Sequence, residues 1–157
     1  MLMTTMPFNR PIGLWFMTIV GILLLAVLIF GQMMAFIDYD FTVSLGLQEP
    51  AEMIGVMGIA VNKAFGLGDT VVYVPLLVAG LAGLWLRKQW GVFAMAGALA
   101  ITAYWPAVCF SLLFFARGTP DFHFTRFVPY GIVLALVFIY ALWGLWYLYA
   151  RREGRGA

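Results

Sequence analysis

Three long runs without a charged side chain constrain this chain more than any other feature of its sequence. They cover residues 13–36, 91–116 and 128–150. A helix needs about 20 apolar residues to cross the ~30 Å hydrocarbon core of a bilayer, so each run is long enough for one span. Charged residues make up only 10% of the chain, whereas soluble domains carry about 25%. The sequence therefore predicts an integral membrane protein and excludes a soluble globular domain.

A fourth apolar segment, residues 70–86, lies at the lower edge of the length that a span requires. The segment before it, residues 50–65, is interrupted by Glu52, Asn62 and Lys63. A run of this kind is typical of an interfacial or re-entrant helix rather than of a span. We therefore expect one membrane domain over residues 1–157. Its fold class is all-α, a four-transmembrane-helix bundle with an additional short interfacial or re-entrant helix in the first outer loop.

The distribution of basic residues predicts how these spans are oriented. Under a four-span arrangement, one side of the membrane receives Arg10, Arg87, Lys88, Arg151, Arg152 and Arg155. Cytoplasmic loops carry an excess of Lys and Arg, so this side is expected to be the cytoplasm. The triplet Gly-Leu-Trp occurs three times, each time at this end of a span, which predicts an aromatic belt there. We expect a plasma (inner) membrane protein with cytoplasmic N- and C-termini and acidic outer loops.

Cysteine and histidine content limits the chemistry that the chain can perform. The single cysteine, Cys109, forbids an internal disulfide and a CxxC redox pair. The single histidine, His123, cannot build a multi-histidine metal site. The sequence contains no HExxH, GxSxG or P-loop motif. We therefore lean toward a protein that is not an enzyme, and the sequence indicates no particular cofactor.

Polar and aromatic groups at one membrane depth form the main candidate site. At 1.5 Å per helical residue, Asp69 lies about 24 Å from Trp85, a tryptophan of the predicted inner belt. Similar counts put a group from every span at this depth in the outer half of the membrane. An ionisable group inside a membrane is a functional-site hypothesis by default. Aromatic walls with few polar groups suit a lipid or a quinone-like molecule. The predicted ligand-binding residues are Gln32, Asp69, Tyr73, Tyr104, Trp105 and Tyr130.

Structural interpretations of the same residues remain open. An aspartate before an apolar run, as in the sequence GDT, is a good helix N-cap, so Asp69 has a purely structural alternative. Tyrosines near the outer surface are also typical of an aromatic belt.

Acidic residues of the outer loops form a second candidate site. Carboxylate oxygens in this number suit a hard cation such as calcium. The candidate metal ligands are Asp38, Asp40, Glu49, Glu52, Asp121 and His123. Their spacing matches no EF-hand loop, and solvated loop charge that fixes the topology is the alternative interpretation.

Three classes of function are compatible with these features. The first is a non-catalytic subunit or scaffold of a membrane assembly, which is favoured because the chain has no catalytic motif. Its partner, another protein or a second copy of this chain, would contact small-residue helix faces such as Ala94, Ala98 and Thr102. The second is a binder, or an enzyme, acting on a lipid or quinone-like ligand in an outer-leaflet pocket around Asp69. The third is an oligomeric small transporter. Apart from the lipid bilayer no partner is indicated, and nucleic acid is excluded because the basic residues form no groove-sized cluster.

Overall fold

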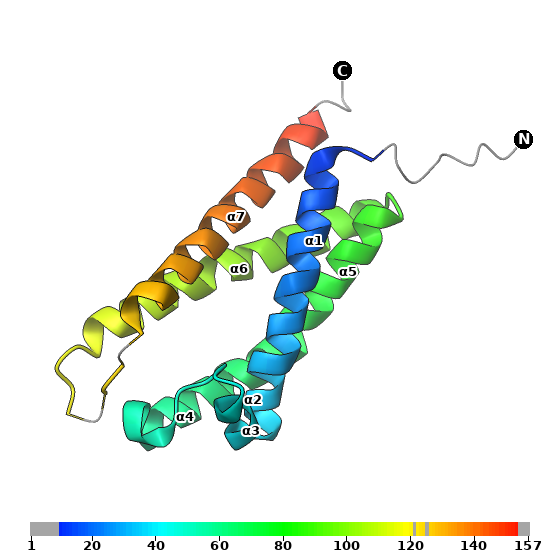
Figure 1. Ribbon diagram of the computed structural model, residues 1–157. Helices are drawn as coiled ribbons and strands as arrows, with labels where there is room; N and C mark the ends of the chain where they lie inside the picture. The colour runs from blue at the N-terminus through cyan, green and yellow to red at the C-terminus, as the bar shows by residue number, and fades with distance from the viewer. Residues whose placement is uncertain (1–9, 121, 125, 154–157) are drawn as a thin grey trace, which may run out of the picture.

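Four long apolar helices form the framework of the protein. The computed structural model describes residues 10–120, 122–124 and 126–153, and these residues form helices and connecting segments without a strand. The helices that are long and apolar enough to cross a membrane cover Ile12–Ile37, Ala51–Trp85, Gln89–Phe115 and Phe127–Ala150. They support a membrane location, and they confirm the prediction of an all-helical chain with four helices long and apolar enough to span a membrane. Figure 1 shows them as one elongated bundle.

Each of the first two spans contains a π-helical turn. The first span consists of α1 (Ile12–Val27), the π turn η2 (Leu28–Met33) and α2 (Met34–Ile37). The short helix α3 (Tyr39–Ser44) follows it. The remaining elements are α4 (Ala51–Gly68), the π turn η3 (Asp69–Tyr73), α5 (Val74–Trp85), α6 (Gln89–Phe115) and α7 (Phe127–Glu153).

No break in helical structure separates the predicted short helix, residues 50–65, from the predicted second span, residues 70–86. Helical structure continues from α4 through η3 into α5, and Asp69 has ordinary helical backbone angles. The break in α4 lies at Gly55, whose positive φ of 67° is a conformation that glycine adopts at low cost. The glycine at position 66 has a packing role instead, because a Cβ there would collide with the carbonyl oxygen of Gln32. Figure 1 shows α4 lying across the lower end of the bundle before the chain turns into α5.

A very close helix contact joins α5 and α6 near the end of the bundle where the chain turns between them. A Cβ on Gly91 would lie 2.6 Å from the backbone nitrogen of Leu84, and a Cβ on Gly80 would lie 2.7 Å from the Cα of Met95. Small residues permit such close approach of two helix backbones, which is how helices in lipid associate. Part of the small-residue content of the sequence is therefore used inside the bundle.

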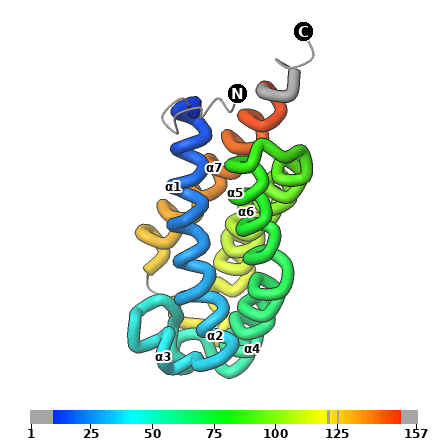
Figure 2. Tube along the Cα trace, turned by 90° about the vertical axis from the view of Figure 1, so that its right-hand side faces the viewer, coloured from blue at the N-terminus to red at the C-terminus, as the bar shows by residue number. Residues whose placement is uncertain are grey.

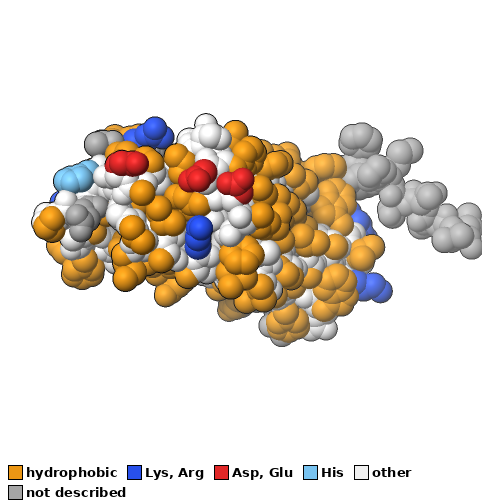
Figure 3. Space-filling view, turned by 90° about the horizontal axis from the view of Figure 1, so that it is seen from below, with side chains coloured by type: hydrophobic (Ala, Val, Ile, Leu, Met, Phe, Trp, Pro, Cys, Tyr) orange, Lys and Arg blue, Asp and Glu red, His pale blue; other side chains and the backbone are white. Residues whose placement is uncertain are grey.

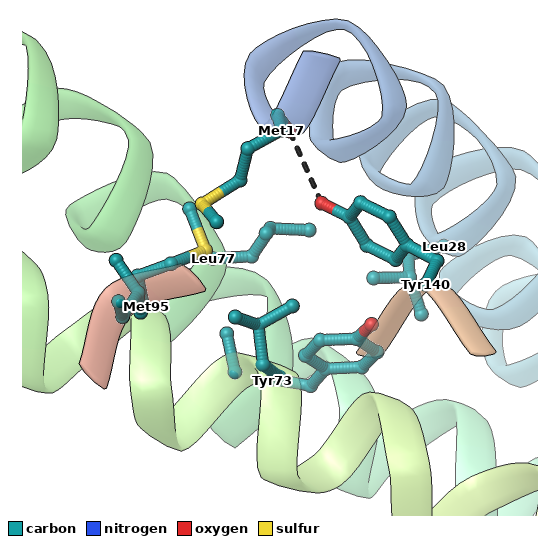
Figure 4. Close-up of a cluster of buried hydrophobic side chains, with 9 residues drawn as sticks. Met17, Leu28, Tyr73, Leu77, Met95 and Tyr140 are labelled. Atoms are coloured by element: carbon teal, nitrogen blue, oxygen red, sulfur yellow. Dashed lines mark hydrogen bonds between the residues drawn. The ribbon is translucent and has the colours of Figure 1, made fainter. Parts of the chain in front are cut away.

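The hydrophobic core fills the half of the bundle nearest to this turn. Met17, Leu77, Met95 and Leu99 are almost completely buried there. The hydroxyl of Tyr140 in α7 donates to the Met17 carbonyl in α1 at 3.1 Å, as Figure 4 shows. This contact joins the first and last spans across the core.

Arg10, Arg87 and Lys88 lie at one end of the bundle, whereas the acidic side chains gather at the other end together with Lys63 and Arg126. Arg10 donates to the Trp85 carbonyl at 2.8 Å, and the Trp15 and Trp85 rings meet edge to face with centroids 4.9 Å apart. The α5–α6 turn with Arg87 and Lys88 lies at this end. Figure 2 shows that α3 and α4 lie at the other end, and Figure 3 shows acidic side chains gathered there. We call the basic end inner and the acidic end outer.

Candidate functional site

A large cavity occupies the outer half of the bundle. We call it the outer cavity; its volume is about 1250 Å³, and α1, η2, α4, η3, α6 and α7 all contribute to its wall. Ligand sites typically measure ~300–1,000 Å³ and are lined mainly by apolar groups with a few polar ones. This cavity therefore has room for a polar head group together with part of a hydrocarbon tail.

Five of the six predicted ligand-binding residues line this cavity. They are Gln32, Asp69, Tyr73, Trp105 and Tyr130. Tyr104 does not line it and is 65% exposed on the outer surface of α6. Successive helix positions point about 100° apart, so the neighbours Tyr104 and Trp105 face different surroundings. A depth count along the sequence gives no rotational position, so it cannot separate Tyr104, which does not line this cavity, from Trp105, which does.

Asp69 is not the helix N-cap that its sequence context allows. It lies inside the continuous second span, is only 7% exposed, and makes no side-chain capping bond. Its Oδ2 atom is buried and has no hydrogen-bond partner among the described residues. The same holds, within the described part of the chain, for Oε1 of Gln32. We call Asp69 Oδ2 and Gln32 Oε1 the acceptor pair.

The acceptor pair is carried by the two π turns. Gln32 lies in η2 and Asp69 begins η3, and these two turns pack against each other. A π turn inserts one extra residue into a helix and is frequent at functional sites. The extra residue changes the direction of the side chains that follow it. As a result, the two π turns direct Gln32 and Asp69 toward the same cavity.

A hydroxyl pair on η3 and α6 closes the floor of the cavity. The hydroxyls of Tyr73 and Thr102 form a short hydrogen bond, and the Thr102 hydroxyl also lies 2.7 Å from the Ala98 carbonyl. Both residues line the cavity and both are buried. Unlike the acceptor pair, these hydroxyls are satisfied within the protein. Their hydrogen bonding holds the wall of the cavity rather than offering free groups to a ligand.

Tyr130 of α7 contacts Cys109 of α6, which lies two helical turns beyond Thr102. The Tyr130 hydroxyl donates to the Cys109 sulfur at 3.6 Å, and both residues line the cavity. Cys109 is therefore part of the cavity wall, whereas the sequence alone gave it no such position.

A polar network ties the first outer loop to the bundle. Gln48 donates to the Gly31 carbonyl at 3.1 Å, and Asn62 donates to the Gln48 side-chain oxygen at 2.8 Å. Asn62 also donates to the Tyr39 hydroxyl, which in turn donates to the Glu49 carbonyl at 2.9 Å. Burial raises the pKa of the Tyr39 phenol, the Asn62 hydrogen bond opposes the shift, and the nearby Glu49 charge adds to it. Tyr39 therefore stays protonated and keeps its donor role.

The two outer connections meet above the cavity. The His123 backbone amide donates to the Met53 carbonyl at 2.7 Å, and Arg126 lies 4.0 Å from the Glu49 carboxylate. These contacts link the α6–α7 connection to the start of α4, which crosses the outer end of the bundle (Figure 1). The outer end of the cavity is therefore covered by chain.

The predicted cation site is not assembled by the described residues. No group of three or more histidine, cysteine, aspartate or glutamate side chains among them is placed to hold a metal. Asp38 instead caps α3 by accepting from the Phe41 amide at 3.0 Å, and Asp40 lies exposed in the first turn of that helix. Glu49, Glu52 and His123 line the outer cavity. Asp121 lies outside the described residues.

Several wall residues were not predicted from the sequence. The cavity is also lined by Thr102, Cys109, Gln48 and Asn62. Neighbouring positions in each of these stretches have a similar polarity or lie at a similar depth, so the sequence does not single these residues out. A usable signal was present for Asn62, because an amide in an apolar helix usually seeks a buried partner.

Comparison with known proteins adds no relative from which a role can be transferred: no family model, curated protein sequence or solved structure matches the chain. Fold and cavity together define a class, namely a helical protein with four helices long and apolar enough to cross a membrane and a mainly apolar cavity in its outer half.

Proposed function

We propose that this protein binds a small hydrophobic ligand in the outer cavity, with Asp69 and Gln32 as its polar anchors. The observation that carries the proposal is the acceptor pair, which lacks a donor among the described residues. A buried polar atom without a partner costs about 1–3 kcal/mol, and more if it is charged. We therefore expect a bound ligand to donate hydrogen bonds to these two atoms of the cavity lining.

The inward orientation of the polar layer favours a binder over a subunit or scaffold. Groups that only cap helices or form an interfacial belt have no reason to converge on one cavity, as five of the predicted residues do. The subunit role remains the alternative. Its best surface is the exposed face of α6 that carries Ala100, Ala107 and Ser111, where a partner helix can approach closely. The oligomeric transporter has no specific support in the described residues.

Native mass spectrometry of gently extracted protein tests the binding function. We expect the wild type to retain a small molecule of defined mass, and Asp69→Asn to lose it. Asparagine keeps the shape of aspartate but replaces one carboxylate oxygen by a donor. The matched control is Asp40→Asn, because Asp40 is exposed and does not line the cavity. Equal retention by Asp69→Asn would contradict the role of Asp69. A bound protein partner with no small mass would support the subunit alternative.

The proposed location is the inner membrane, with both termini in the cytoplasm. Arg10, Arg87 and Lys88 support this orientation through the positive-inside rule. In a Cys109→Ala background, Lys88→Cys is expected to react with an impermeant maleimide only after the cells are opened. Thr119→Cys, at the other end of α6, is expected to react on intact cells. The reverse pattern would show that the outer cavity faces the cytoplasm.

A further inference from the structure

The gap between the first and last spans shows how a ligand reaches the outer cavity. Near the inner end α1 and α7 touch: Phe16 meets Trp143 with ring centroids 5.0 Å apart, and Tyr140 bonds to Met17. Toward the outer end the two helices diverge, as Figure 1 shows. Val27 lies about 15 Å further along the helix than Met17. Val27 and Val133 both line the cavity there, and they are 56% and 55% exposed.

This gap opens toward lipid rather than toward water. Its two sides carry apolar residues of membrane-spanning helices, namely Leu24, Val27 and Leu28 on one side and Val133 and Val137 on the other. The aqueous outer end is crossed by α4 and tied to the α6–α7 connection by the His123–Met53 hydrogen bond. A ligand dissolved in the bilayer therefore meets no polar barrier at the gap.

The chemistry of the cavity selects the head group of that ligand. The acceptor pair needs hydrogen-bond donors, because Asp69 Oδ2 and Gln32 Oε1 receive none from the described residues. The carboxylates of Glu49, Glu52 and Asp69 line the same cavity, whereas the lining base Arg126 already faces Glu49. Like charges repel, so an anionic head group is disfavoured there. A hydroxyl donates a hydrogen bond without bringing a charge into an apolar site, whereas an ammonium has to be stripped of water and is compensated only where a carboxylate pairs with it directly.

We propose that the ligand is a membrane-dissolved alcohol or phenol with a hydrocarbon tail, which enters between α1 and α7 and donates its hydroxyl to Asp69 or Gln32. This inference rests on the proposed binding function. It goes further by assigning the head-group chemistry and the route of entry. A quinol and a hydroxyl-bearing neutral lipid share the required chemistry, and competition between them distinguishes these two sources.

Photolabelling of the protein in vesicles of neutral phospholipid tests the head group. Three probes carry the same diazirine-bearing tail and end in a hydroxyl, in its methyl ether or in a carboxylate. We expect the alcohol to label residues 24–31 and 129–137 at least tenfold more than either other probe. Loss of one good hydrogen bond costs about this factor, since tenfold corresponds to about 1.4 kcal/mol. Excess quinol or diacylglycerol should suppress the labelling, and the stronger competitor indicates the natural source.

Two substitutions test the site and the route of entry. Gly31 lines the cavity, and a Cβ added there would meet only one atom, of the Val27 side chain, at 4.0 Å. The larger side chain of Gly31→Leu should therefore fill the cavity and remove the labelling. Gly68→Leu is its control, because Gly68 is exposed and does not line the cavity. Val133→Trp should slow labelling several-fold by narrowing the gap, whereas Ile132→Trp, at an equally exposed position outside the cavity lining, should not.

The outcomes separate failure of this inference from failure of the proposed function. Equal labelling of the cavity by alcohol and ether would overturn the head-group assignment while leaving a binding site. Unchanged labelling rates in Val133→Trp would overturn entry between α1 and α7. If none of the three probes labels the cavity and native mass spectrometry finds no retained mass, the binding function itself is wrong.

Discussion

Replacing Asp69 by leucine is expected to make the ligand-free protein more stable, by about 1–3 kcal/mol in the free energy of unfolding. Asp69 is 7% exposed, and its Oδ2 belongs to the acceptor pair, which receives no donor from the described residues. Leucine has a similar length and removes the unsatisfied polar group from the cavity wall. The measurement is reversible unfolding in mixed micelles after removal of bound small molecules.

Thr102→Val is the matched contrast for this experiment. Thr102 lines the same cavity and is also buried, but its hydroxyl is bonded to the Tyr73 hydroxyl and to the Ala98 carbonyl. Valine keeps the shape and leaves the Tyr73 hydroxyl without this partner, so we expect a loss of about 1–3 kcal/mol. The two substitutions therefore act in opposite directions. A loss of stability in Asp69→Leu as large as in Thr102→Val would show that Asp69 has a structural role.

Ligand dependence adds a second criterion to the same measurement. A molecule that binds the folded protein raises its stability in proportion to the logarithm of its concentration over Kd. The long-chain alcohol should therefore stabilise the wild type and leave Asp69→Leu unchanged. A residue that costs stability in the free protein and recovers it with ligand is typical of functional sites, where activity and stability compete.

The spans were predictable because their signal depends on composition over many residues. Runs such as residues 91–116 have no charge over a length that crosses a bilayer, and that property survives any local detail of packing. The α6 span follows this run closely, although Pro106 lies inside it.

The boundary in the second span was not predictable because it depends on tertiary contact. The sequence GLGD at residues 66–69 contains two glycines and an aspartate, which usually mark the end of one helix and the start of the next. Here Gly66 is small because α4 crosses the Gln32 carbonyl closely, and the helix continues through a π turn. Local sequence cannot distinguish a glycine that breaks a helix from one that allows another helix to approach.

The sequence gives the depth of each residue of the candidate site along its helix but not the direction in which its side chain points. Counting residues from the inner tryptophans puts Asp69, Tyr73 and Tyr130 at one depth, and in the structure all three line one cavity. The π turns at Leu28–Met33 and Asp69–Tyr73 have no recognised sequence signal, yet they set the direction of the side chains in this layer. The direction in which Gln32 and Asp69 point is therefore a property of the fold.

Replacing Gly91 by alanine is expected to destabilise the bundle by about 1–3 kcal/mol, the usual cost of overpacking a close contact. The added Cβ would lie 2.6 Å from the Leu84 nitrogen and would overlap the backbone of Gly83. Backbone atoms cannot rotate away as side-chain ends do, so α5 and α6 must separate.

Gly97→Ala is the control for this substitution, because it places the same methyl group on the same helix. There a Cβ would meet the Leu76 side chain at 3.6 Å, which is ordinary van der Waals contact. Alanine also favours a helix over glycine by about 1 kcal/mol, so Gly97→Ala should be neutral or stabilising. The two variants are compared by reversible unfolding in mixed micelles. Equal stability of both would mean that α5 and α6 do not approach as closely as these glycines allow. In that case, close packing of α5 against α6 would no longer explain how Tyr73 is held against Thr102 at the floor of the outer cavity.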